Sequence, residues 1–319
     1  MRAIETLDET VAALSTAILL LSAASTAAVL HLRFRSFRSR RRNRLLGLNS
    51  LWPVRLLLVL FASLWALAEL LRLPLLRPLL PLPLPLRYDP TPLCLAHVFA
   101  AHALAEPCFF ATVLFLLRAT NQPKSSSSAL AAALAAALAT AIPFFTLHAL
   151  FLYLPTDFLR RVGIPVDLLG PPSFAYRVRL SAVATEPRCT YPLFGAVLLA
   201  ALGAVYVPLF VSACWGAVSV VINKRLRVRL YALAAVVVAA LCVQVATLAL
   251  SALWDPGKMT SEGLKLASFV AVSCCAAAGE VILVVQPVLE ALAIVDPDPP
   301  GTEGKDDVIG IDAAGFGDG

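Results

Sequence analysis

Apolar stretches long enough to cross a bilayer recur seven times along the chain, separated by short segments rich in Arg, Pro, Ser or Asp. A helical crossing takes about 20 predominantly apolar residues, because a backbone in lipid must satisfy its own hydrogen bonds. The pattern predicts an all-α membrane protein, a bundle of seven transmembrane helices. The predicted spans are residues 11–32, 51–71, 95–117, 129–154, 191–222, 230–254 and 266–295.

Composition supports this fold class. Hydrophobic residues make up 60% of the 319 residues, charged residues make up 14%, and the mean hydropathy is +0.83. A soluble domain carries about 25% charged residues, so this composition excludes a water-soluble globular fold. We expect an extracellular N-terminus over residues 1–10, a seven-helix domain over 11–295, and a disordered acidic cytoplasmic tail over 296–319.

A block of arginines after the first span predicts the orientation. Cytoplasmic loops carry an excess of Lys and Arg, so this side is expected inside and the N-terminus outside. A cleaved signal peptide would carry its basic residues before the apolar run. Because the block adjoins the membrane, it is expected to bind anionic lipid headgroups rather than nucleic acid. The candidate headgroup residues are Arg33, Arg35, Arg38, Arg40, Arg41, Arg42 and Arg44.

Two local patterns predict further detail. Leu130, Leu134 and Leu138 are set in alanine, which predicts a leucine ridge facing away from a smooth alanine surface suited to close helix contact. The alternative is a simple compositional bias toward alanine. In the long loop 156–190, polar and apolar residues alternate from Phe174 to Ser181, which predicts a short extracellular strand or hairpin.

The cysteines indicate a disulfide rather than a metal or redox motif. Of seven cysteines, only Cys94 and Cys189 fall at the predicted outer edge. The outer face is an oxidising compartment, so we expect a bond that ties the long loop across the mouth of the bundle. Two free thiols are the alternative. The cysteines show no CxxC spacing and no paired His, so a zinc or redox motif has no support and no cofactor is expected.

The seven spans with Cys94 and Cys189 resemble rhodopsin-like G-protein-coupled receptors, in which a cysteine at the outer end of the third helix bonds to the second outer loop. Their motifs differ from this chain. Arg118 ends the third span without the acid-Arg-aromatic triplet, and Gln286 and Pro287 stand where those receptors have Asn-Pro. The resemblance therefore implies a shape and does not imply coupling to a G protein.

The last third of the chain resembles a family of uncharacterised plant seven-span membrane proteins. Fainter similarity surrounds His102, Glu106 and Pro107. The family has no established activity, so this resemblance implies architecture and lineage but no mechanism. The residues that carry it are the run Val221 to Arg227, then Gln244, Trp254, Asp255, Pro256, Gln286, Pro287 and Val288.

Ionisable residues inside spans are the strongest functional signal, because a charge at the bilayer centre costs a few kcal/mol unless it finds a partner. His102 and Glu106 are four residues apart and share a helix face. His97 and Glu69 are expected near the interface, with no special role. The candidate cavity residues are His102, Glu106, His148, Gln244 and Glu280.

Converging, these side chains would line a cavity that opens outward. It would suit a cationic ligand, a proton-linked transport path, or a metal held by His and carboxylate. The alternative is that each group only locks helix packing. No side chain is assigned as a metal ligand on sequence grounds.

No enzyme template occurs, since HExxH, GxSxG, GxxxxGK[ST] and GxGxxG are all missing. No catalytic residue is assigned, and the chain is not expected to be an enzyme. Three hypotheses remain: a receptor-like or signalling protein that uses the outward cavity, a proton- or cation-coupled transporter, and a non-catalytic membrane scaffold. We expect the plasma membrane rather than an endomembrane, and the sequence identifies no protein partner.

Overall fold

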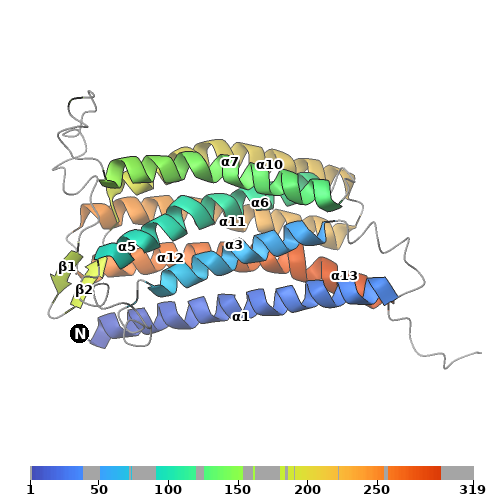
Figure 1. Cartoon of the computed structure of the whole chain (residues 1–319), viewed down its shortest axis with the longest axis horizontal. Helices are drawn as coiled ribbons and strands as arrows, with labels where there is room; N and C mark the ends of the chain where they lie inside the picture. The colour runs from blue at the N-terminus through green and yellow to red at the C-terminus, as the bar shows by residue number, and fades with distance from the viewer. Residues whose placement is uncertain are drawn as a thin grey trace, which may run out of the picture.

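The computed structural model describes residues 2–38, 51–71, 73, 91–119, 126–153, 161, 180–183, 186–189, 191–221, 223–254 and 258–295. Within them, seven helices are long and apolar enough to cross a membrane. They run side by side along the long axis of the molecule (Figure 1). Among the described residues, the only strands form one short hairpin. The body of the protein is therefore helical, as the apolar pattern predicts.

Two of the seven helices contain a π-helical segment. The remaining five are α1 (Arg2–Arg38), α3 (Trp52–Leu71), α7 (Ser126–Tyr153), α10 (Leu193–Val220) and α11 (Lys224–Leu253). The third helix in chain order consists of α5 (Thr91–Val98), η2 (Phe99–Ala105) and α6 (Glu106–Ala119). The seventh consists of α12 (Met259–Glu280), η4 (Val281–Val285) and α13 (Gln286–Val295). Each predicted span falls on one of these helices, but α1 starts at Arg2 rather than at residue 11, α11 at Lys224 rather than at 230, and α12 at Met259 rather than at 266.

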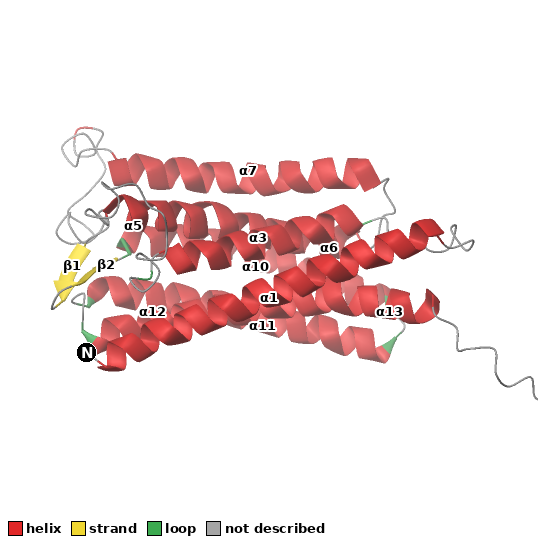
Figure 2. Ribbon diagram, turned by 60° about the horizontal axis from the view of Figure 1, so that its bottom comes forward, coloured by secondary structure: helices red, strands yellow, loops and turns green. Residues whose placement is uncertain are grey.

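The two ends of the bundle differ. The start of α1, the start of α5 and the hairpin lie at one end, and the end of α13 lies at the other (Figures 1 and 2). The hairpin pairs β1 (Leu180–Val183) with β2 (Glu186–Cys189) antiparallel. It lies in the loop where a strand or hairpin is predicted, but only Leu180 and Ser181 belong to the alternating run. Residues 174–179 lie outside the described residues.

The alanine-rich helix α7 packs through its small residues. Every fourth residue from Ala129 to Ala141 is at most 2% exposed, whereas Leu130, Leu134 and Leu138 are 37–42% exposed. Small side chains let backbones approach closely, and the Cys108 Sγ of α6 donates a 3.7 Å hydrogen bond to the Ala137 carbonyl oxygen. The predicted leucine ridge and alanine surface are confirmed.

Proline accounts for both π-helical segments. Proline has no N–H, and its ring clashes with the carbonyl group four residues back. Pro107 follows η2 closely, and Pro287 follows η4. The residue before each proline instead donates its N–H five residues back, Glu106 to Ala101 and Gln286 to Val281. A π-turn is wider than an α-turn, so each segment relieves the clash with the proline ring. It also shifts the direction in which the following side chains point around the helix axis.

Basic residues gather at the end of the bundle where α13 ends. Arg229 Nη1 lies 2.5 Å from the Glu290 carboxylate, and the Arg33 guanidinium lies 3.7 Å from the centre of the Trp52 ring. Of the predicted headgroup residues, only Arg33 and Arg35 have described side chains; those of Arg38, Arg40, Arg41, Arg42 and Arg44 lie outside the described set. The acidic segment 296–319 also lies outside it.

The alanine surface predicts a position-specific response to added volume. Ala133→Leu places a large side chain in a close helix contact, and overpacking of this kind costs about 1–3 kcal/mol. The matched control Ala135→Leu adds the same side chain at an exposed position of the same helix. Thermal unfolding in detergent should show a lower Tm for Ala133→Leu only. Equal effects of the two variants would contradict the packing described.

Candidate functional site

Glu106 is the centre of a buried hydrogen-bond cluster. Its side chain is 2% exposed. Trp65 Nε1 of α3 donates to Oε1 at 3.3 Å, and Gln244 Nε2 of α11 donates to Oε2 at 2.9 Å. His102 Nδ1 lies 2.9 Å from Oε1. Since a carboxylate can only accept, the His102 ring carries its proton on Nδ1, and one carboxylate joins α3, η2 and α11.

A second cluster adjoins the first through His102. His97 is fully buried, and its Nδ1 lies 2.8 Å from the Ala68 carbonyl oxygen. A carbonyl only accepts, so Nδ1 donates, and in a neutral ring Nε2 accepts from the Tyr191 hydroxyl at 2.8 Å. The Glu69 carboxylate lies 3.9 Å from the same Nε2. One ligand atom each from Glu69, His97 and His102 lie within 4.8 Å of one another.

The π-helical segment η2 explains how His97 and His102 come together. On a regular α-helix, residues five apart point roughly 140° apart around the axis. A π-turn closes its hydrogen bond at five residues, so His97 and His102 are brought toward one side, with ring centroids 5.9 Å apart. A sequence search at α-helical spacing misses this pair. The signal available was Pro107, which disrupts the preceding turn.

Sequence reasoning also missed a buried ion pair on α12. Lys265 Nζ lies 2.8 Å from the Glu262 carboxylate, and the two residues are 4% and 8% exposed. Both fell outside the predicted span because its start was placed at residue 266. When the start of a span is predicted from apolar content alone, it is placed too far along the chain, because a helix can also include buried charged residues that are paired.

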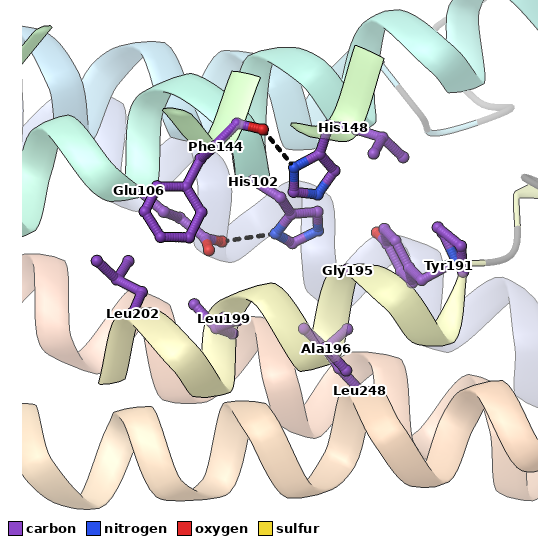
Figure 3. Close-up of a pocket in the computed structure, with 12 residues that line it drawn as sticks. His102, Glu106, Phe144, His148, Tyr191, Gly195, Ala196, Leu199, Leu202 and Leu248 are labelled. Atoms are coloured by element: carbon purple, nitrogen blue, oxygen red, sulfur yellow. Dashed lines mark hydrogen bonds and ion pairs between the residues drawn. The ribbon is translucent and has the colours of Figure 1, made fainter. Parts of the chain in front are cut away.

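Two pockets flank the His102–Glu106 pair. The first holds about 430 Å³ of empty space, its opening included, and the polar side chains on it are His102, Glu106, His148 and Tyr191 (Figure 3). Its remaining lining is apolar and comes mainly from α10, with Phe144 of α7 beside it. The second pocket holds about 240 Å³ and is lined in part by Trp65, Glu69, Gln244 and Lys265. His102, Glu106, Tyr191 and Leu248 border both pockets.

His148 presents a nitrogen to the first pocket. Its Nδ1 donates to the Phe144 carbonyl oxygen at 2.9 Å, so Nε2 is left as an acceptor. That buried Nε2 has no hydrogen-bond partner in the described structure. Gly195 lies opposite, where an added Cβ would stand 3.6 Å from Nε2. A glycine at this position therefore keeps the space beside the imidazole open.

Glu280 does not join this cluster. It is fully buried, and its carboxylate accepts hydrogen bonds from Ser22 Oγ at 2.6 Å and Ser25 Oγ at 3.2 Å. It is not among the residues lining either pocket. The structure thus corrects the expectation of one cavity holding Glu106 and Glu280. Similar depth does not fix the direction around the helix axis, and Glu280 instead joins α12 to α1.

Four aromatic side chains of α6 and α10 pack together beyond the first pocket, toward the end where α13 terminates. Phe109 and Phe110 follow Glu106 on α6, and Tyr206 and Phe210 follow the pocket residues of α10. The ring centroids of successive members are 5.8, 5.1 and 5.4 Å apart. Phe109 also packs against α12, since a Cβ on Gly279 would lie 3.1 Å from its ring. We call these four residues the aromatic layer.

Six of the seven cysteines have described side chains, and the bonding state of each agrees with the sequence-based expectation. Cys94 is disulfide-bonded. The five that are not bonded are Cys108, Cys214, Cys242, Cys274 and Cys275. The side chain of Cys189 lies outside the described set, so its pairing with Cys94 stays a prediction.

Comparison with protein families gives one match. A family model described as "Uncharacterised conserved protein UCP031277" matches residues 3–299. This agrees with the resemblance to an uncharacterised family, while the description names no organism, so plant origin stays a prediction. No curated protein sequence matches the chain.

The Glu106 cluster predicts coupled mutational effects. Gln244→Leu removes one donor and leaves a buried carboxylate oxygen unsatisfied, which costs about 1–3 kcal/mol. Glu106→Leu should be destabilising too, but the double variant should cost less than the sum of the single changes. Chemical unfolding in detergent measures the cycle. Val243→Leu, at an exposed neighbour, is the control, and strict additivity would argue against the contact.

Proposed function

We propose a receptor-like role for this chain, which belongs to the family of uncharacterised conserved proteins UCP031277. In this proposal the seven helices cross the plasma membrane, with the N-terminus outside and the C-terminus in the cytoplasm. The first pocket binds a small ligand from outside, and the chain catalyses no reaction. The observation that carries the proposal is the first pocket, in which the polar side chains of His102, Glu106, His148 and Tyr191 converge within a mostly apolar lining.

The distribution of charge supports the orientation. The start of α1 and the hairpin share one end of the bundle (Figure 1). The residues next to the opposite end include Arg33, Arg35 and Arg118, together with the start of α11 at Lys224. Positive charge is favoured on the cytoplasmic side, where these side chains would bind anionic headgroups. Both pockets, each bordered by Tyr191, would then lie toward the outside.

The lining of the first pocket favours a small, partly apolar amine. Glu106 supplies a carboxylate and His148 supplies a nitrogen acceptor, and both suit a ligand that donates hydrogen bonds. Phe144 and Leu199 supply apolar walls. A few convergent polar groups in a mostly apolar cavity are typical of small-molecule sites, and the aromatic faces of Phe144 and Tyr191 suit a cation.

The aromatic layer favours a receptor over a transporter. The titratable row from Glu106 through His102 to His97 and Glu69 could serve proton coupling, but every member lies on the hairpin side of that layer. Transport would require a polar path through it. The scaffold hypothesis makes a different prediction: if the chain is a scaffold, Glu106→Gln leaves the function of the protein unchanged.

Ligand binding is tested with a panel of small aromatic and aliphatic primary amines. A ligand that binds the folded state raises its Tm in a saturable way. At least one amine should do so for the purified chain in detergent. Gly195→Val fills the space beside His148 and should abolish the shift, as should Glu106→Gln. Gly203→Val adds the same side chain to α10 where nothing lies within 4 Å, and it should keep the shift.

Two outcomes would count against the ligand site. If no amine in the panel raises the Tm of the unaltered chain, the pocket does not select amines. If the shift survives Gly195→Val, the ligand binds elsewhere.

The orientation makes a separate prediction. An epitope before Met1 should be accessible to antibody on intact cells, and one placed after Gly319 should become accessible only after permeabilisation. The reverse staining pattern would overturn the proposed topology without affecting the geometry of the pockets.

A further inference from the structure

We propose that Glu69, His97 and His102 bind a divalent transition-metal ion, with zinc the best match to the ligand types. The three side chains come from two helices, and one ligand atom of each lies within 4.8 Å of the others. The inference concerns the cluster behind the first pocket and does not depend on a receptor role. It also differs from the sequence-based expectation, which assigned no metal ligand.

Both histidines are oriented as metal-binding histidines are. A ligating imidazole commonly donates its other N–H to a backbone carbonyl or a carboxylate, which fixes its tautomer and direction. His97 makes the first type of bond, to the Ala68 carbonyl oxygen at 2.8 Å. His102 makes the second type, to Glu106 at 2.9 Å. In the neutral form of each ring Nε2 carries the lone pair, and these are the nitrogens that an ion would bind.

The outer contacts of this cluster are themselves held in place. Glu106 orients His102 and is fixed by Trp65 and Gln244 at 3.3 and 2.9 Å. This gives the buried Gln244 amide and the Trp65 indole a role beyond helix packing. In natural metal sites, hydrogen bonds of this kind to the ligand side chains hold those side chains in position.

The ligand set indicates the class of ion. Two imidazoles and one carboxylate are a common zinc set, and they leave a fourth position for water or another ligand. The distance between His97 Nε2 and Glu69 Oε1 is 3.9 Å, whereas neighbouring ligands in tetrahedral zinc lie roughly 3.4 Å apart for bonds of about 2.1 Å. Glu69 would have to move toward His97 Nε2 to close this difference. The Tyr191 hydroxyl must also turn away from Nε2.

The test uses the full chain in detergent, stripped with chelator and then titrated with Zn²⁺ alone. Bound metal per chain is measured by mass spectrometry after desalting, together with Tm. We expect one zinc per chain and a higher Tm. Glu69→Gln and His97→Gln should lose stoichiometric binding, and Glu106→Gln should weaken it roughly 10–100-fold. His148→Gln changes a buried histidine outside the cluster and should keep one zinc.

Binding of Co²⁺ gives a second test that uses only the unaltered chain and so does not depend on whether a variant folds. Bound by the unaltered chain, it should give the intense visible bands of four-coordinate cobalt. The proposal is overturned if the stripped chain binds no Zn²⁺ at micromolar concentration. It is equally overturned if zinc remains stoichiometric in Glu69→Gln and His97→Gln, or if His148→Gln loses it as readily as they do.

Discussion

The buried carboxylate of Glu106 is the contact on which the rest of the polar interior depends. A carboxylate removed from water is costly unless its oxygens are fully hydrogen-bonded. Here Trp65, His102 and Gln244 satisfy it from three helical segments. Their positions are therefore linked, because moving one helix would break a bond that lipid cannot replace. Both pockets are built on this arrangement, since Glu106 and His102 border each of them.

Proline gives this contact its geometry. Pro107 removes an α-helical hydrogen bond just after Glu106, and the preceding residues widen into η2. The wider turn brings His97 and His102 toward the same side, next to Glu69 and Tyr191. The second π-segment, η4, begins directly after Glu280. Each irregular segment thus adjoins a buried glutamate, as is common for π-turns at functional sites.

The parts of the fold that depend on hydrophobic period and length could be predicted from the sequence. The seven helices follow from apolar runs, and the packing face of α7 follows from the spacing of Leu130, Leu134 and Leu138. The hairpin was placed in the correct loop, although its strands begin only at Leu180.

The candidate site was predictable only in part. His102, Glu106, Gln244 and His148 were selected because polar groups in apolar helices need partners, and they do border the two pockets. Glu280 was expected with them, but depth along the membrane normal says nothing about direction around the helix. His97 and Lys265 were missed for two different reasons: one depends on the π-turn, and the other lies on an extension of α12 beyond its apolar core.

The two pockets differ in character within the half of the bundle next to the hairpin. The first pocket offers space and an apolar wall, the second is lined by the charged cluster, and the aromatic layer lies beyond the first pocket on α6 and α10. The His102 side chain borders both pockets. A structural change at one pocket would therefore be transmitted to the other through the His102 imidazole. The account requires that His97 and His102 be neutral, with Nδ1 protonated and the Nε2 lone pair available.

The most direct measurement of that requirement is nitrogen NMR on the purified chain labelled with ¹⁵N-histidine, with His97→Gln and His102→Gln used for assignment. The account predicts that each ring shows one protonated and one unprotonated nitrogen at neutral pH, with the proton on Nδ1. Two imidazolium rings would contradict it, because the buried carboxylates would then be balanced by protons and neither histidine would offer a lone pair.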